Sequence, residues 1–261
     1  MKIRIITAVI AILLFFPFVF YGDWPFKVIM YIIATIGVLE LLRIRKTTRY
    51  PIPAFITLLL LWSLLYPNSD IFYMNKIEMA LLSVLLLLSY TVLVKNKFTF
   101  DDAGFMVLSA IYVGLGFYYF METRLEAENG LIYIFYAIVV ILATDTGAYF
   151  FGKAFGKRKL WPEISPNKTI EGAIGGIFLA CIAAFVFLTF FPVEHSSFIV
   201  FIVTVLASAF GQVGDLVESA IKRHYHVKDS GKILPGHGGI LDRFDSWLFV
   251  FPLLHFINFI S

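Results

Sequence analysis

Residues 131–151 read LIYIFYAIVVILATDTGAYFF, an apolar run that holds a single acid, Asp145. An α-helix needs about 20 mainly apolar residues to cross the hydrocarbon core of a bilayer, so this run is long enough to span a membrane. An acid at membrane depth is costly and is therefore a candidate for a functional site. The stretch predicts an α-helical membrane protein with a polar site inside it.

The rest of the chain has the same apolar character. Its 261 residues are 60% hydrophobic and only 15% charged, and its mean hydropathy is +0.86. A soluble domain of this length has too little interior to bury so much apolar surface. The single cysteine, Cys181, excludes an intrachain disulfide and a cysteine-rich metal site. A net charge of +3 gives no indication of a nucleic-acid partner.

Clusters of glycine, proline and charge divide the chain into nine apolar segments. They cover residues 5–22, 24–42, 51–66, 77–94, 103–120, 131–151, 171–192, 197–217 and 242–260. The expected fold class is all-α, a polytopic integral membrane protein of about nine transmembrane helices with a polar cavity facing the cytoplasm. Residues 1–100 would supply N-terminal transmembrane helices. Residues 101–261 would form the catalytic region, with polar loops at 152–170 and 218–241.

The basic residues are unevenly distributed between the two sides of these segments. With the N-terminus inside, only Lys27, Lys76 and Arg124 of the 21 basic residues fall on the outer side. Positively charged loops are retained in the cytoplasm. We therefore expect a multi-pass membrane protein whose two long polar loops, 152–170 and 218–241, face the cytoplasm, where nucleotides are available.

The segment 211–223, GQVGDLVESAIKR, begins at membrane depth and then becomes polar. In a helix it would stack Asp215, Ser219 and Lys222 on one face, with Glu218 beside them. Such a face either neutralises its own charges or borders a polar cavity as part of a site.

Residues 228–245, KDSGKILPGHGGILDRFD, are rich in groups suited to a nucleoside triphosphate. Glycines let backbone N–H groups approach phosphate oxygens, and basic side chains neutralise phosphate charge. Asp242 and Asp245 are three residues apart, so both carboxylates could face one divalent cation. Each element alone also fits a turn, an N-cap or a loop residue such as His237. Their concentration in a chain poor in charge favours a site.

The polar loop after residue 151 has similar features. It contains the stretch 165–172, SPNKTIEG, and the basic cluster 153–159. Asp145 and Lys168 are favoured as site residues, whereas the basic cluster is better explained as a topology signal. Ser165 and Thr169 are equally typical of a helix start.

These segments resemble the signature of the phosphatidate cytidylyltransferases, also called CDP-diacylglycerol synthases. The family pattern S-x-hydrophobic-K-R-x4-K-D-x-small-x2-hydrophobic-P-x-H-G-G-hydrophobic-x-D-R-hydrophobic-D is matched throughout from Ser219 to Asp245. The stretches 145–149 and 165–172 are also similar to family patterns. The resemblance therefore covers about the C-terminal half, and the N-terminal half matches only in being hydrophobic.

The resemblance implies an enzyme of phospholipid biosynthesis that transfers CMP from CTP to phosphatidate, giving CDP-diacylglycerol and pyrophosphate. It also implies Mg²⁺, at one or two sites, and a homodimer in the lipid bilayer. The implied catalytic residues are Asp215, Asp242, Asp245, Lys222, Arg223 and His237. The implied metal ligands are Asp215, Asp242, Asp245 and Glu218. The implied substrate-binding residues are Lys228, Asp229, Arg243, Ser219, Gly238, Gly239, Asp145, Lys168 and Glu171.

Three other interpretations start from the same residues. A sister enzyme could use CTP on another lipid acceptor, such as an isoprenoid-ether phosphatidate or a polyprenol. A transporter would more naturally place its charges near the midplane of broken helices. A membrane anchor with basic loops would explain the Lys and Arg pattern but would leave Asp215, Asp242 and Asp245 without a role.

Overall fold

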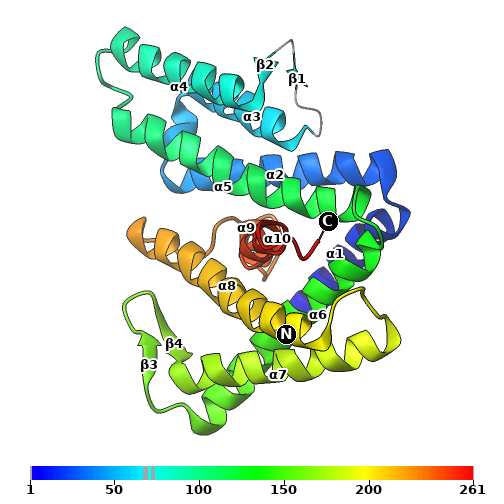
Figure 1. The fold of residues 1–261 in the computed structure, drawn as a ribbon. Coiled ribbons are helices and arrows are strands. Elements are labelled where there is room, and N and C mark those ends of the chain that lie inside the picture. Colours follow the sequence, from blue (N-terminus) through cyan, green and yellow to red (C-terminus); the bar gives the residue numbers. More distant parts are fainter. Residues whose placement is uncertain (1, 67–69, 72–73, 261) are drawn as a thin grey trace. The chain divides into compact units, whose positions relative to one another are not determined.

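The computed structural model describes residues 2–66, 70–71 and 74–260, and most of them are helical (Figure 1). The α-helices are α1 (Lys2–Tyr21), α2 (Asp23–Ile44), α3 (Pro51–Leu65), α4 (Lys76–Leu93), α5 (Phe100–Leu125), α6 (Gly130–Phe155), α7 (Ile170–Phe190), α8 (Ser197–His224), α9 (Leu241–Phe244) and α10 (Trp247–Phe256). A short 3-10 helix, η1 (Thr47–Arg49), precedes α3.

Two small antiparallel hairpins accompany the helices. In the first, β1 (Asp70–Ile71) pairs with β2 (Met74–Asn75). In the second, β3 (Lys159–Trp161) pairs with β4 (Ser165–Thr169), so that Lys159 lies opposite Thr169. The second hairpin occupies most of the polar segment that was expected to be a loop.

The multi-pass helical class is confirmed for the described residues. Six of their helices, α2, α4, α5, α6, α7 and α8, are long and apolar enough to cross a membrane. The other apolar helical stretches of the described residues are shorter: residues 6–21 of α1, α3 with 15 residues and α10 with 10, against the about 20 that a span needs. The count of nine spans and the cytoplasmic cavity stay predictions.

Two boundaries expected from the sequence are wrong. Residues 218–224 are helical rather than part of a loop, because α8 continues to His224. Glu218 and Lys222 form an ion pair one turn apart, which stabilises these last turns. The segment 242–260 is not one helix but is interrupted after α9. There the Asp245 side chain accepts the Ser246 N–H, a local bond that competes with helical pairing.

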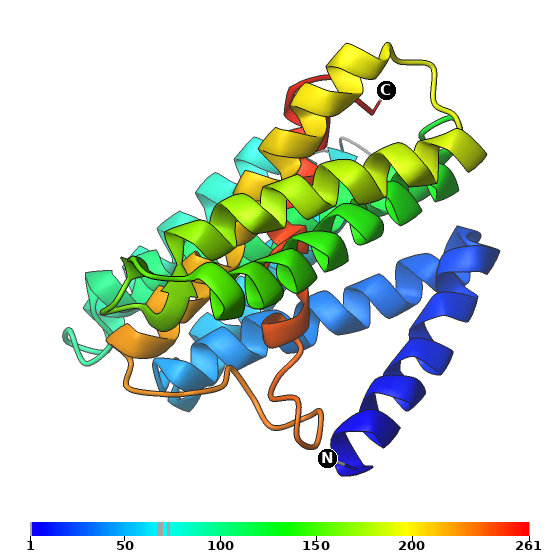
Figure 2. The same cartoon turned by 90° about the horizontal axis from the view of Figure 1, so that it is seen from below.

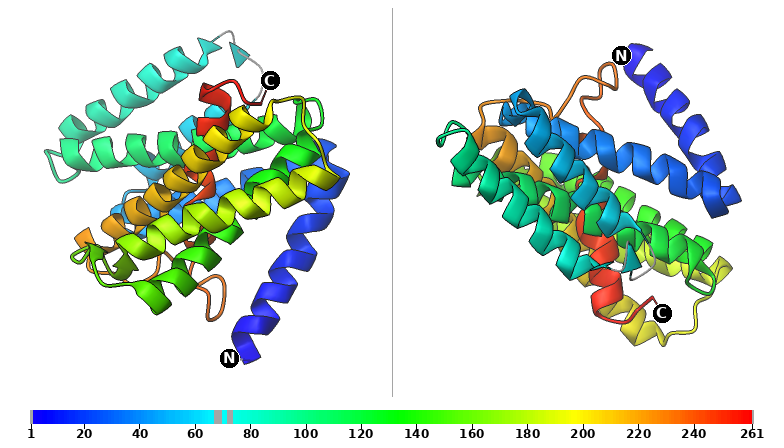
Figure 3. Two further views of the ribbon diagram at one scale, coloured as in Figure 1. Left: turned by 60° about the horizontal axis from the view of Figure 1, so that its bottom comes forward. Right: turned by 90° about the horizontal axis from the view of Figure 1, so that it is seen from above.

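The chain forms two compact units, and the first comprises Met1–Met121 and Asp229–Leu241. Within it, α3 and α4 pack against each other as an antiparallel pair (Figure 3). A Cβ added to Gly114 of α5 would lie 3.2 Å from the side chains of Leu61 and Leu64, so α5 fits closely against α3. Residues 229–241 reach the N-terminal half of α1, where Thr7 donates a hydrogen bond to the Pro235 carbonyl oxygen (Figure 2). The functional division expected at residues 100 and 101 stays a prediction.

The second unit comprises Glu122–Lys228 and Asp242–Ser261. Its helices α6 and α7 lie side by side along their lengths (Figure 2). A Cβ added to Gly147 would lie 2.8 Å from the Gly175 carbonyl oxygen, and one added to Gly176 would lie 2.7 Å from the Thr144 carbonyl oxygen. Small residues let membrane helices approach backbone to backbone. This close pair supports α8, which packs against α6, α7 and α10.

Candidate active site

The second unit holds four of the predicted aspartates. Asp145 lies on α6, Asp215 on α8, Asp242 on α9 and Asp245 between α9 and α10. Gly214 brings α8 against the α9–α10 turn, because a Cβ added there would lie 2.6 Å from the Asp245 carbonyl oxygen. The negative charges of Asp215 and Asp145 both act on Asp245. Three elements that are distant in sequence therefore bring acidic groups to one place.

The surroundings of Asp245 are unfavourable for a negative charge. Burial raises the pKa of its carboxyl to about 7, and the charge of Asp215 acts in the same direction. Its side chain accepts the Ser246 N–H at 2.7 Å, which favours the ionised form but does not offset burial. A bound cation would stabilise the ionised form of this group.

Two lysines are in direct contact with the acids. Lys168 Nζ lies 2.6 Å from Asp215 Oδ2, and Lys222 Nζ lies 2.6 Å from Asp242 Oδ1. Lys222 also pairs with Glu218, whose residue surface is only 1% exposed. Lys168, expected from the sequence as a site residue of the other polar segment, thus contacts Asp215 of α8, and its role in binding substrate stays a prediction.

The position of Lys168 follows from its local structure. It lies on β4, one residue before the N-cap of α7. The N-cap Thr169 accepts the Gly172 N–H at 3.1 Å, which satisfies a donor at the helix start. The hairpin and the cap together direct residue 168 towards α8.

Two other predicted site residues, Ser219 and Glu171, form hydrogen bonds within the protein. The Ser219 hydroxyl donates to Asp215 Oδ1 at 3.4 Å, a long and weak hydrogen bond. Glu171 accepts the backbone N–H groups of Lys157 and Arg158 at 3.1 and 3.2 Å. Glu171 therefore fixes the connection between α6 and β3, and its role in binding substrate stays a prediction.

The glycine-rich residues 229–241 belong to the first unit. They form a tight turn in which the Leu234 N–H donates to the Gly238 oxygen at 3.0 Å and the His237 N–H to the Leu234 oxygen at 2.9 Å. Gly236 and Gly238 have φ values of 76° and 86°, a backbone conformation that side chains rarely allow. These glycines are thus required by the turn itself, whatever else their N–H groups bind.

The remaining predicted groups are spread over both units. Lys228, Arg223 and Arg243 of the second unit are exposed, as is Asp229 of the first. Arg243 lies within electrostatic reach of Asp145. Arg223 donates to the Val227 carbonyl oxygen at 3.4 Å. The roles of these four residues and of His237, Gly238 and Gly239 stay predictions.

Glu40 on α2 is a candidate that was not predicted from the sequence. Its carboxylate is fully buried and accepts hydrogen bonds from Ser230 and from the backbone of Ile240 and Leu241. All four residues belong to the first unit. An acid within the apolar segment 24–42 is the same indication that identified Asp145 and Asp215, and it could have identified Glu40.

Carboxylates such as these are of the chemical type that could hold Mg²⁺ together with the phosphates of a nucleotide. In the part of the chain that the structure describes, no group of three or more His, Cys, Asp or Glu side chains is arranged to hold a metal ion. Mg²⁺ usually binds through one or two carboxylates together with substrate phosphates and water. Asp215 and Asp242, each now paired with a lysine, offer the hard oxygen ligands that this mode needs.

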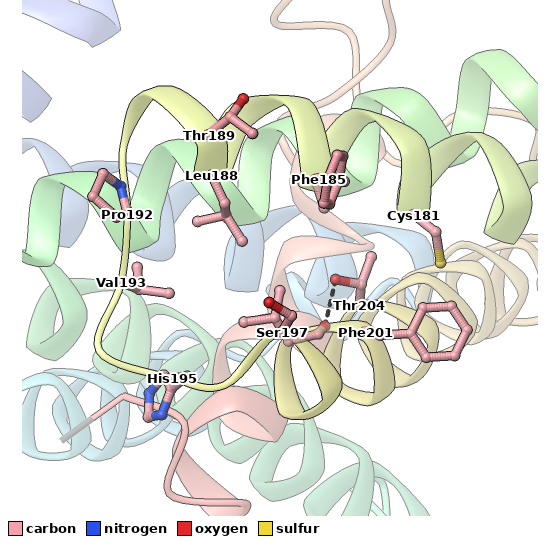
Figure 4. Close-up of a pocket in the computed structure, with 12 residues that line it drawn as sticks. Cys181, Phe185, Leu188, Thr189, Pro192, Val193, His195, Ser197, Phe201 and Thr204 are labelled. Carbon is pink, nitrogen blue, oxygen red and sulfur yellow. Dashed lines mark hydrogen bonds between the residues drawn. The ribbon is translucent and has the colours of Figure 1, made fainter.

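A cavity of about 310 Å³ lies between the end of α7 and the start of α8 (Figure 4). Cys181, Phe185, Phe201 and His195 are among its lining residues. Thr204, the lining residue of α8 that is nearest in sequence to Asp215, precedes it by three turns, on the order of 16 Å along a helix. This cavity is therefore separate from the cluster of aspartates.

Comparison with known proteins gives matches over nearly the whole chain. The model of the cytidylyltransferase family matches residues 2–261. A phosphatidate cytidylyltransferase of Bacillus subtilis (strain 168) is 54% identical over 261 residues, which cover 98% of this chain and 97% of that protein. Proteins of the same name from Staphylococcus haemolyticus (strain JCSC1435) and Staphylococcus aureus (strain COL) are each 48% identical over 259 residues, covering 98% of both chains.

Proposed function

This chain belongs to the cytidylyltransferase family, and we propose that it is a phosphatidate cytidylyltransferase of phospholipid biosynthesis. It transfers CMP from CTP to phosphatidate and releases pyrophosphate. The observation that carries the assignment is the end-to-end similarity, 54% over 98% of the chain, to a protein of that name. The contacts of Lys168 and Lys222 with aspartates supply a site suited to the reaction.

In the proposed reaction, a phosphate oxygen of phosphatidate attacks the α-phosphorus of CTP. The new P–O bond forms as the bond to the β-phosphate breaks, and pyrophosphate leaves with the bonding electron pair. No covalent enzyme intermediate is needed, so the protein contributes mainly by positioning and charge neutralisation. Lys168 and Lys222 would turn from their aspartates towards the triphosphate, and Arg243 would add a third cation near Asp145.

Mg²⁺, at one or two sites, is part of the proposal. Asp215 and Asp242 would hold it, with Asp245 and Glu218 as further candidates. When bound, the ion neutralises phosphate charge as pyrophosphate departs. The mutual repulsion of Asp145, Asp215 and Asp245 supports this assignment, because a cation offsets it.

The proposal also includes the location, orientation and oligomeric state of the protein in the membrane. The protein would reside in the bacterial cell (inner) membrane with its active site facing the cytoplasm. The basic residues support this orientation, since only Lys27, Lys76 and Arg124 fall on the outer side. A homodimer rests on the family resemblance alone, and light scattering of the detergent complex tests it.

The assignment is tested with purified protein in detergent, labelled CTP, Mg²⁺ and a panel of lipid acceptors. Phosphatidate is expected to give a lipid-soluble cytidine product, and omission of Mg²⁺ with added chelator should abolish it. Product from a polyprenol phosphate but not from phosphatidate would indicate a sister enzyme. No product from any acceptor, with folded protein, would overturn the assignment.

A further inference from the structure

Glu40 lies near the C-terminal end of α2, one of the helices long enough to span the membrane. None of its surface is exposed. A buried, unpaired carboxylate is strongly disfavoured, so this side chain requires partners. They come from the other end of the chain.

Three donors surround the Glu40 carboxylate. The Ile240 N–H donates to Oε1 at 2.9 Å. The Leu241 N–H and the Ser230 hydroxyl donate to Oε2 at 3.0 and 2.9 Å. Hydrogen bonds to an ionised group are about twice as strong as neutral ones. Glu40 is therefore bonded to both ends of the glycine-rich segment 229–241.

The segment is shaped to fit this carboxylate. A Cβ added to Gly231 would lie 2.2 Å from Glu40 Oε1, and one added to Gly239 would lie 2.4 Å from Oε2. One turn before Glu40, Gly37 leaves room for the Leu241 side chain, whose Cδ2 would lie 3.3 Å from an added Cβ. The backbone at Gly231 and Gly239 therefore packs directly against the Glu40 side chain of α2, with no space for a Cβ at either position.

Two of these hydrogen bonds lie at the start of α9, directly before Asp242 in the chain. Ile240 and Leu241 supply backbone donors at the start of α9, where a helix leaves its N–H groups without intrahelical partners. The next residues of α9 are Asp242 and Arg243. A carboxylate that holds residues 240 and 241 therefore sets where the following peptide begins.

We propose that Glu40 is a positioning residue: its carboxylate holds the backbone of the glycine-rich segment 229–241 in the conformation seen here, including the first residue of α9. It acts through the backbone and touches no substrate. The kinetic consequence rests on the proposed function, whereas the effect on the backbone does not. A helix of the N-terminal half thereby sets the conformation of the glycine-rich segment 229–241.

The test compares Glu40→Gln with a matched control, Asp102→Asn. Asp102 is also a buried acid of the first unit, and it accepts bonds from Arg45 Nε at 2.8 Å and the Thr99 N–H at 3.0 Å. Glutamine keeps the shape of Glu40 but turns an NH₂ group towards a donor. We expect about a tenfold rise in KM for CTP in Glu40→Gln, with KM for phosphatidate within twofold.

The control separates positioning from stability. Asp102→Asn should lower the yield of folded protein without changing either KM. If Glu40 were only structural, Glu40→Gln would behave in the same way, with fewer active molecules and an unchanged KM for CTP. That outcome would overturn the proposal.

Hydrogen exchange provides a readout that does not depend on activity. Peptides covering residues 229–241 in substrate-free Glu40→Gln should exchange at least tenfold faster than in the parent, whereas α3 and α4 should be unchanged. Unchanged exchange at Ile240 and Leu241 would contradict the proposal even in an active enzyme. Faster exchange in Glu40→Gln, together with a parent protein that does not react with CTP, would support the positioning role and count against the proposed function.

A double-variant cycle covers the case in which Glu40→Gln does not fold. Gly231→Ala alone pushes a methyl group into the carboxylate, whereas Glu40→Asp withdraws the carboxylate by one methylene. In the double variant Glu40→Asp/Gly231→Ala, the backbone amides of residues 229–241 should exchange more slowly than in Gly231→Ala alone. Additive effects of the two substitutions would contradict direct contact between these positions.

Discussion

The two units place acidic side chains in opposite situations. In the first, Glu40 is fully buried and bonded to three donors of residues 230, 240 and 241. In the second, Asp145, Asp215 and Asp245 repel one another, and Lys168 and Lys222 contact acids that could release them. An acid in an apolar segment indicates function by default, but its partners decide which function.

The difference concerns what each acid can still bind. The Glu40 carboxylate faces backbone N–H groups that cannot leave without disrupting the turn, so it has little capacity for a ligand. Asp215 and Asp242 of the second unit contact lysine side chains, which in the proposed function turn to phosphate when a nucleotide binds. We therefore assign positioning to the first kind of acid and chemistry to the second.

The largest effect is expected where the chemistry is assigned. Asp215→Asn should lower the rate of CMP transfer by about a hundredfold or more, because it removes the charge that contacts Lys168 and that is proposed to hold the cation. Thermal unfolding should change little, since the substitution relieves repulsion from Asp245. Labelled-CTP turnover per folded molecule measures the effect. Wild-type turnover would remove Asp215 from the site.

A smaller effect, on stability, is expected from a substitution that disturbs the packing of α8 against the α9–α10 turn. Gly214→Ala would place a methyl group 2.6 Å from the Asp245 carbonyl oxygen, so α8 and the α9–α10 turn must separate. Overpacking of this kind costs about 1–3 kcal/mol of unfolding free energy. Chemical denaturation in detergent should show that loss. The neighbouring Gly211 is the control, because its added Cβ would come no nearer than 3.4 Å to Val250 and 3.7 Å to Ser246. An equal loss in Gly211→Ala would contradict the argument.

The sequence singled out the acids that the structure brings together in the second unit, but not the groups that support them. Asp145 and Asp215 stand out because they are isolated acids in apolar runs, and the apolar segments locate most of the helices. The continuation of α8 to His224 does not follow from hydrophobicity, because residues 218–224 are polar. Lys222 in this stretch pairs with Asp242, which lies 20 residues away in the sequence.

Glu40 was missed for a related reason. Its partners are separated from it by 190 to 201 residues, and two of them are backbone N–H groups that have no sequence signature. The small residues at positions 231 and 239 could be read as turn glycines. Only the fold shows that they also leave room for a carboxylate.

The account rests on the difference between the two kinds of acid, and one paired measurement tests it most directly. Turnover of CTP with phosphatidate and the midpoint of thermal unfolding are measured for Asp242→Asn and Glu40→Gln. Asp242→Asn should lose about a hundredfold in turnover and keep its midpoint, because Lys222 retains Glu218 as a partner. Glu40→Gln should keep measurable turnover, with a lower midpoint and a raised KM for CTP. The reverse pattern, an active Asp242→Asn or a Glu40→Gln indistinguishable from the parent, would contradict the account.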